Sequence, residues 1–175
     1  NNIEVLPTIS ASDLTMNYRN SKFTAKALDD KGNPLVNDTI TFNINGVFYK
    51  RATDNEGNAY LNINLNVGKY IITSTDSKGL STSNTIKINK ATTTITGGNS
   101  NIIVNIGMNY NVILIGENNK PLDSSTVHFR YNNHVVDAIT DKNGKATINI
   151  NNLPIGTYSI DFWYDGNINY CPSES

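Results

Sequence analysis

Residues 23–68 read FTAKALDDKGNPLVNDTITFNINGVFYKRATDNEGNAYLNINLNVG, and residues 110–156 read YNVILIGENNKPLDSSTVHFRYNNHVVDAITDKNGKATININNLPIG. The second stretch repeats the first. The matched positions are Pro34 and Pro121, Phe42 and Phe129, Thr53-Asp54 and Thr140-Asp141, Gly57 and Gly144, Ala59 and Ala146, and the Gly-x-Tyr motifs at 68–70 and 156–158. A repeat of about 87 residues is too long for a solenoid unit of roughly 20–50 residues and fits a β-sandwich domain of roughly 100.

Two-residue turns inside the repeat predict β-hairpins. Asn45-Gly46 is a strong hairpin signal because both central residues of a type I′ turn have positive φ. In the second copy the same place is taken by Asn132-Asn133. The first turn pairs Ile44 with Val47, Asn43 with Phe48 and Phe42 with Tyr49; the second pairs Tyr131 with His134, Phe129 with Val136 and His128 with Asp137.

Apolar residues alternate with polar ones through most of the remaining segments, as expected of strands with one buried face. Alternation predicts strands at residues 23–27, at 60–65 and, at the end of the first copy, at 85–88. The counterpart of the last strand is Ser173–Ser175, which we expect to be a truncated strand. No segment shows a convincing helical period.

The Gly-x-Tyr motif resembles the tyrosine corner of Ig-like sandwiches, in which a Tyr hydroxyl bonds back to the backbone near the start of a strand. The sequence therefore predicts an all-β fold made of two tandem Ig-like antiparallel β-sandwiches. The predicted domains are residues 1–89 and 90–175.

Composition excludes several functional classes. The formal net charge is −1 and the pI is about 6.1, so the chain lacks the basic surface that nucleic acid binding requires. No apolar run reaches the 18 residues of a membrane span. Neither end reads as a signal peptide or an anchor, and we expect a mature fragment of a longer protein, monomeric by itself.

The sequence offers few candidate residues for covalent cross-links or metal sites. Glutamine is absent, so thioester and ester cross-links cannot form, and Cys171 has no cysteine with which to form an intrachain disulfide. An intramolecular Lys–Asn isopeptide bond needs a buried lysine, but Lys26, Lys50 and Lys87 fall on the polar phase of their strands. The sequence predicts no catalytic residues and no cofactor.

The acidic turns favour structure over metal binding. Asp54 and Asp141 occupy equivalent places in Thr-Asp-x-x-Gly turns, where an aspartate accepts backbone N–H bonds. A calcium site remains the alternative, but no Asp-x-Asp-x-Asp-Gly loop is present. His128 and His134 fall on opposite faces of the predicted hairpin, which disfavours a shared zinc ion.

One surface of the second copy is a candidate ligand-binding site. Adjacent third and sixth strands place five side chains on one outer face: His128, Arg130, Asp137, Asp161 and Trp163. A single Trp flanked by charged groups suits stacking on a sugar or on a partner protein. The first copy has Thr41, Asn43 and Thr73 at three of these positions. Alternatively, Trp163 is partly buried by its neighbours or covers the junction between the domains.

The run GNPLVNDTITFNINGVFYKRATDNEGNAYLNINLNVGKYIITS (residues 32–74) resembles the Ig-like repeats of adhesin-like surface proteins of methanogenic archaea, as does ASDLTMNYRNSKF before it. ATTTITGGNSNIIVNIGMNYNV (residues 91–112) and YDGNINYCPSES (residues 164–175) are similar to a sister repeat and to bacterial Ig-like, invasin-type repeats. Cys171 departs from the small polar residue usual in that ending.

The resemblance implies sandwich modules in long arrays on the cell wall, with a role in adhesion or spacing and no catalysis. It implies an extracellular, cell-surface location and, as partners, other cells or surface glycans and proteins. A glycan- or protein-binding module that uses the Trp163 face is the first alternative. An accessory domain of an enzyme is the second.

Overall fold

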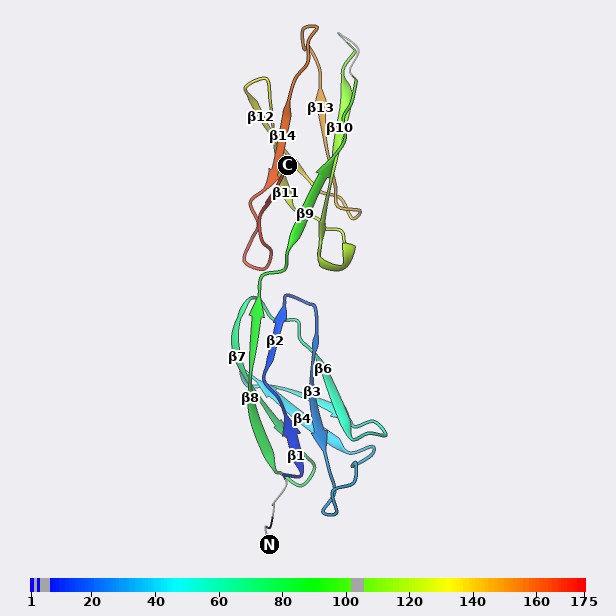
Figure 1. Cartoon of the computed structure of the whole chain (residues 1–175), viewed down its shortest axis with the longest axis vertical. Helices are drawn as coiled ribbons and strands as arrows, with labels where there is room; N and C mark the ends of the chain where they lie inside the picture. The colour runs from blue at the N-terminus through cyan, green and yellow to red at the C-terminus, as the bar shows by residue number, and fades with distance from the viewer. Residues whose placement is uncertain (2, 4–6, 102–105) are drawn as a thin grey trace. The chain divides into compact units, whose positions relative to one another are not determined.

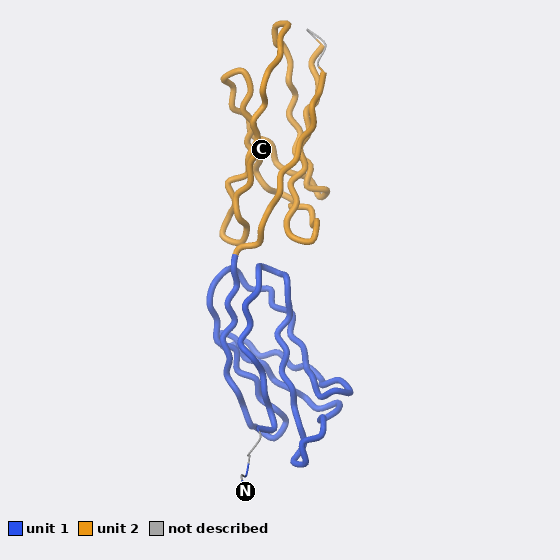
Figure 2. Tube along the Cα trace, in the orientation of Figure 1, with its two compact units in different colours: residues 1–89 blue, residues 90–175 orange. Residues whose placement is uncertain are grey.

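The computed structural model describes residues 1, 3, 7–101 and 106–175. The chain divides into two compact units, residues 1–89 and 90–175 (Figure 2). Strands dominate both units, and each unit has its own buried apolar cluster. No helix in the described part of the chain is long and apolar enough to cross a membrane.

Unit 1 packs a three-stranded sheet, β1-β3-β6, against a five-stranded sheet, β2-β8-β7-β4-β5 (Figure 1). Its strands are β1 (Ile9–Ala11), β2 (Leu14–Asn17), β3 (Lys22–Ala27), β4 (Thr39–Ile44), β5 (Val47–Ala52), β6 (Asn58–Asn62), β7 (Gly68–Thr75) and β8 (Ser81–Asn89). Phe23 and Phe42 meet edge to face between the sheets, with ring centroids 6.0 Å apart. The core is therefore the interior of a β-sandwich.

Unit 2 repeats this plan with the sheets β9-β10-β13 and β12-β11-β14-β15. Its elements are β9 (Thr93–Gly97), β10 (Met108–Gly116), the 3₁₀ turn η1 (Glu117–Asn119), β11 (Thr126–Tyr131), β12 (His134–Ile139), β13 (Lys145–Ile150), β14 (Ile160–Tyr164) and β15 (Ser173–Glu174). Tyr110, Phe129 and Phe162 form its aromatic centre, with ring centroids 6.3–6.5 Å apart.

The hairpin registers predicted from the sequence are confirmed. β4 pairs with β5 so that Phe42 lies opposite Tyr49, and β11 pairs with β12 so that Phe129 lies opposite Val136. Asn45 and Gly46 both have positive φ, at 53° and 80°. The turn residues thus fix the register, and the register places Phe42 and Phe129 in the two cores.

A tyrosine hydroxyl donates to the backbone in each unit, as the Gly-x-Tyr motif predicts. Tyr70 donates to the carbonyl of Asn66 at 2.8 Å, and Tyr158 donates to that of Pro154 at 2.9 Å. A Cβ on Gly68 would lie 3.3 Å from the Tyr70 ring. The glycine therefore leaves room for the ring that makes this corner.

The Thr-Asp-x-x-Gly turns are built alike in both units. The Asp54 carboxylate accepts backbone N–H groups of Glu56 and Asn58, each at 2.9 Å. Asp141 accepts those of Asn143 and Lys145 at 2.8 and 3.0 Å. These hydrogen bonds to the charged form hold the pKa of both aspartates below the usual value, the bonds from Asn58 and Lys145 being the largest causes. The structural interpretation of these turns is confirmed.

The two sandwiches are antiparallel as predicted, apart from one pair of strands in unit 1. β1 pairs with β3 in the first sheet, and the chain then crosses over, so that β2 runs parallel to β8 in the second. Asp13 fixes this crossing because its carboxylate accepts the backbone N–H of Thr85 at 2.8 Å. Because the chain changes sheet without reversing its direction, β2 runs parallel to β8.

Two predicted strand limits also need correction. The strand expected at residues 60–65 ends at Asn62, since its partner β3 begins at Lys22, directly opposite. Ile63 is still buried beyond the end of the strand. β8 begins at Ser81 rather than Thr85, because an Asp76–Gly79 turn leads directly from β7 into it.

Candidate functional site

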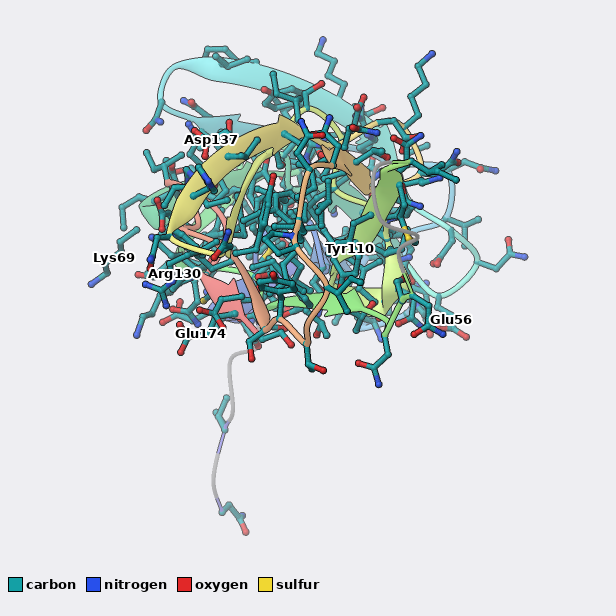
Figure 3. All side chains as sticks on the ribbon, turned by 90° about the horizontal axis from the view of Figure 1, so that it is seen from above. Glu56, Lys69, Tyr110, Arg130, Asp137 and Glu174 are labelled. Carbon is teal, nitrogen blue, oxygen red and sulfur yellow. The ribbon has the colours of Figure 1, made fainter. Side chains whose placement is uncertain are left out.

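The five predicted site residues come together on the outer face of the β12-β11-β14-β15 sheet. His128 lies opposite Asp137 on β12 and opposite Trp163 on β14, and Arg130 lies opposite Asp161. Their common face follows from the two-residue period of a strand. Figure 3 labels Arg130 and Asp137 on one side of the view, apart from Tyr110, whose ring lies in the core of unit 2.

His128 is the centre of the group. Its Nδ1 lies 2.7 Å from Oδ1 of Asp137, and its Nε2 lies 3.2 Å from Oδ2 of Asp165. Its ring stacks on Trp163, with centroids 5.2 Å apart and an interplanar angle of 27°. The histidine is therefore held on three sides, by two carboxylates and an indole.

Arg130 and Asp161 form the second pair of this face. The Nε and Nη2 atoms of Arg130 donate to one oxygen, Oδ2 of Asp161, at 3.0 and 2.6 Å. Both side chains are about half exposed, so solvent screens the pair. The positive charge of Arg130 is therefore already paired with the carboxylate of Asp161.

Sequence reasoning missed two acidic residues of this face. Asp165 follows Trp163 by two residues and so projects to the same side as His128, which the strand period could have indicated. Glu174 lies opposite Trp163 on β15. The stretch from residue 165 to residue 172 separates these two strands, so no repeat pattern predicts that register.

The electrostatics of the face favour some ligands over others. Asp137, Asp165 and Glu174 surround the His128–Trp163 stack, while Asp161 balances Arg130. This acidic excess disfavours anionic ligands and suits hydrogen-bond donors or cations. His128 covers one face of the Trp163 ring, which leaves less of the indole for a sugar to stack on.

An Asp–His pair can act as a general base, but the geometry here does not support that chemistry. A general base needs a free ring nitrogen within hydrogen-bond reach of the proton that it removes. Carboxylates contact both nitrogens of His128. The arrangement ties strands β12, β11 and β14 together and presents polar groups to solvent.

The equivalent face of unit 1 is uncharged at three of the corresponding positions and has Lys50 at the place of Asp137. Thr41, Asn43 and Thr73 take the places of His128, Arg130 and Asp161, and Thr73 shares a hydrogen bond of 2.9 Å with Ser83. Phe48 on β5 is 65% exposed. The charged ladder is therefore an addition to unit 2 and not a property of the repeat.

Metal and cross-link chemistry has little support in the described residues. No cluster of three His, Cys, Asp or Glu side chains that could hold a metal ion occurs among them. His134 is exposed and its ring lies 6.1 Å from that of Tyr131, away from His128. All lysines lie in the described ranges and all are exposed, which removes the buried lysine that an isopeptide bond needs. Cys171 is a half-buried free thiol.

No family model matches the chain, and no curated protein matches it. Among solved structures, invasin, a bacterial integrin-binding protein, is similar over 93% of this chain and 37% of its own, with 16% identity and a TM-score of 0.58. The fold is an Ig-like β-sandwich. This chain therefore spans a little over a third of the length of that structure, and the similarity concerns the fold alone.

Two further matches have lower TM-scores. The D0-D1 domains of intimin share 15% identity over 95% of this chain and 96% of theirs, with a TM-score of 0.35. The adhesin InvE of Yersinia pseudotuberculosis shares 16% over 96% and 57%, with a TM-score of 0.36. Neither adds to the fold assignment. The archaeal, methanogen origin stays a prediction from the sequence.

Proposed function

We propose that the chain is a non-enzymatic fragment of a cell-surface adhesin, in which tandem Ig-like modules serve as a stalk and take part in cell adhesion. The observation that supports this most is the duplicated module, whose two copies repeat the same hairpin register, the same tyrosine corner and the same aspartate turn. Its fold is that of a bacterial protein that binds integrin.

The mechanism is mechanical rather than chemical. Each unit has a core of interlocked apolar side chains between hydrogen-bonded sheets, and its turns are fixed by aspartates and glycines. Pulling on such a module must break many backbone hydrogen bonds and expose the core together, which opposes unfolding. We propose that such modules hold a binding region away from the surface of a cell.

Single-molecule force spectroscopy of the whole chain tests the stalk role. We expect two separate unfolding events, each releasing on the order of 300 Å of chain, the extended length of about 85 residues. Gradual extension without separate force peaks would contradict a role in resisting force. Binding to whole cells, measured by pull-down, tests the adhesive role independently.

A second candidate function is a glycan- or protein-binding module that uses the outer face around Trp163. The observation that favours it is the ladder of His128, Arg130, Asp137, Asp161 and Trp163, which unit 1 lacks. We propose neutral or cationic surface glycans and proteins of other cells as the partners.

The experiment compares the wild-type chain with Trp163→Ala on a broad glycan array and in whole-cell pull-downs. Binding that Trp163→Ala abolishes and Phe48→Ala preserves would support the second function. The Phe48 variant is the matched control because this aromatic residue is exposed on the equivalent sheet of unit 1. Equal binding by all three proteins would place the ligand site elsewhere.

A further inference from the structure

The outer face of the five-stranded sheet of unit 1 carries lysines and no carboxylate. Lys50 of β5, Lys69 of β7 and Lys87 of β8 all lie on the side away from the core, as the two-residue period of a strand requires, and all three are exposed. All residues of the five strands are described, and none of them is an aspartate or a glutamate. This face is therefore basic.

Two of these lysines face each other. Lys69 lies directly opposite Lys87 in the β7–β8 ladder, and like charges at opposite positions destabilise a sheet. Within the described part of the chain, none of the three lysines forms an ion pair. Asp13, which leads into β2, is held by the backbone N–H of Thr85. The stability of the sandwich therefore does not explain why three lysines share this face.

The equivalent sheet of unit 2 carries the opposite charge. Its outer face has four carboxylates, those of Asp137, Asp161, Asp165 and Glu174. Arg130 is the only arginine or lysine in the described strands β11, β12, β14 and β15, and it pairs with Asp161. Four carboxylates against one arginine leave three negative charges when His128 is neutral, and the face of unit 1 has three lysines.

Exposed apolar side chains accompany the charges on both faces. Phe48 and Ile71 are 65% and 57% exposed on the outer face of unit 1. Val135 and Ile139 are 61% and 69% exposed on the outer face of unit 2. Exposed apolar groups among charged ones are typical of a surface that contacts another protein. The two faces are therefore alike in apolar content and opposite in charge.

We propose that the outer face of unit 1 docks on the outer face of unit 2 of a second copy of this chain. The three lysines of one copy then lie against the carboxylates around the His128–Trp163 stack of the other. The inference rests on the adhesive role proposed above and names the chain itself as the partner of the Trp163 face. It departs from the sequence-based expectation of a monomer. Neighbouring stalks, on one cell or on two, would adhere through this contact.

Charge complementarity favours a second copy over other partners. A polyanion would match the face of unit 1 and be repelled by that of unit 2, and a polycation would do the reverse, whereas one copy of the chain matches both. Four strands about 4.8 Å apart, with six residues of about 3.3 Å each, make a face of about 20 by 20 Å, so the contact buries on the order of 800 Å² in total. That size is typical of a weak contact, and many weak contacts between arrays add to strong adhesion.

Analytical ultracentrifugation of the full chain tests the contact first. We expect association that depends on protein concentration, with a Kd on the order of 10–100 μM at low salt. Raising the salt concentration to about 0.5 M should weaken association about tenfold, because the charges are exposed and become screened. Trp163 is the only tryptophan and lies on the proposed contact face, so its fluorescence should change over the same range of protein concentration.

Exchanging the charges locates the two faces. The first reversed variant replaces the lysines of unit 1: Lys50→Glu, Lys69→Glu and Lys87→Glu. The second replaces three carboxylates of unit 2: Asp137→Lys, Asp165→Lys and Glu174→Lys. Each variant alone should associate about a hundredfold more weakly than the wild type, because both of its faces then have the same sign. An equimolar mixture should associate again, because the acidic faces of the first variant meet the basic faces of the second.

The matched control makes the same change of net charge outside the five-stranded sheet: Lys22→Glu, Lys26→Glu and Lys31→Glu. These lysines lie on β3 and in the turn after it, and they are exposed like the lysines of the proposed face. We expect the control to associate as the wild type does. Circular dichroism verifies that each variant is folded, and the single reversals Lys87→Glu and Asp165→Lys form a milder pair for the same mixing experiment.

Three results would overturn the proposal. The first is a wild-type chain that stays monomeric at low salt up to about 1 mM. The second is a control variant that loses association as fully as the first reversed variant, since net charge alone would then explain the loss. The third is a mixture of folded reversed variants that stays monomeric. All three are measured on purified protein without cells or glycans, so they are independent of the tests of the stalk and of glycan binding.

Discussion

The two units are most informative where they differ, because the repeat makes each a control for the other. On the outer face of one sheet, unit 2 has His128, Arg130 and Asp161 at the places where unit 1 has Thr41, Asn43 and Thr73. The hairpins and aspartate turns are the same in both. The repeat thus preserves the framework of the sandwich, and the units differ in the outer face of one sheet.

The largest expected effect tests whether the two cores are independent. Phe42 and Phe129 are equivalent, fully buried and in separate clusters. We expect Phe42→Ala to destabilise unit 1 and Phe129→Ala to destabilise unit 2, each by about 3–5 kcal/mol. Urea unfolding can separate them, because Trp163 is the only tryptophan and its fluorescence reports on unit 2.

The control is Phe48→Ala, which removes an exposed ring and should change the unfolding free energy by less than about 0.5 kcal/mol. If Phe42→Ala shifted the Trp163 transition as far as Phe129→Ala does, the two cores would unfold as one unit. The comparison on which the other predictions depend would then fail.

The second prediction separates backbone strain from steric collision at the shared turns. Gly57 has φ +80°, and a Cβ there would lie 2.5 Å from the carbonyl oxygen of Ala27. Gly144, at φ +73°, would collide in the same way with Leu114. Gly32 has φ +81°, but a Cβ at that position would have no neighbouring atom within 4 Å.

We therefore expect Gly32→Ala to cost about 1 kcal/mol from its left-handed backbone alone. Gly57→Ala and Gly144→Ala should each cost about 2–3 kcal/mol, because the neighbouring strand must also move. Thermal unfolding measures the difference. Equal costs at all three positions would mean that the close approach does not matter.

The sequence predicted the parts of the fold that local chemistry determines. Asn45-Gly46 determines one hairpin register, Asp54 and Asp141 determine their turns, and Tyr70 and Tyr158 make their corners. Each of these depends on residues near one another in the chain. The alternation of strands β11 and β14 also placed four candidate site residues on one face, and the hairpin register added Asp137 on β12.

Long-range features were harder to predict. The parallel pairing of β2 with β8 depends on a crossing held by Asp13, whose partners are about 70 residues away in the sequence. Asp165 contacts His128 from one residue beyond the end of β14, and continuing the two-residue period past Trp163 would have placed it on this face.

A smaller effect concerns the stability of the folded state at acidic pH. The folded-state pKa of Asp141 is lowered because its carboxylate accepts backbone N–H groups of Lys145 and Asn143. A lowered folded-state pKa contributes stability above the unfolded pKa, and this contribution is lost as the pH falls through the folded value. We expect stability to decline below about pH 4.

Asp141→Asn keeps an acceptor oxygen but does not titrate, so its melting temperature should fall less steeply between about pH 5 and pH 2 than that of the wild type. Asp30→Asn is the control, because Asp29 and not Asp30 caps that turn. A steeper decline in Asp141→Asn would show that the turn is not a source of acid sensitivity.

The smallest effect concerns the charged ladder that only unit 2 carries. A double-mutant cycle of Arg130→Ala and Asp161→Ala should give a coupling energy of about 0.2–1 kcal/mol, since both side chains are about half exposed. The coupling should shrink at high salt. Removing the pair makes these two positions of unit 2 neutral, like the equivalent positions Asn43 and Thr73 of unit 1.

A coupling above about 2 kcal/mol would mean that the ladder is a main source of stability in unit 2. The weak coupling expected here has a different implication. Unit 1 folds with threonine and asparagine at these positions, so the charges are not needed to form the sheet. Charged residues that a fold does not require are then more readily explained by recognition than by stability. A small coupling energy between Arg130 and Asp161 would support that explanation, and a large one would contradict it.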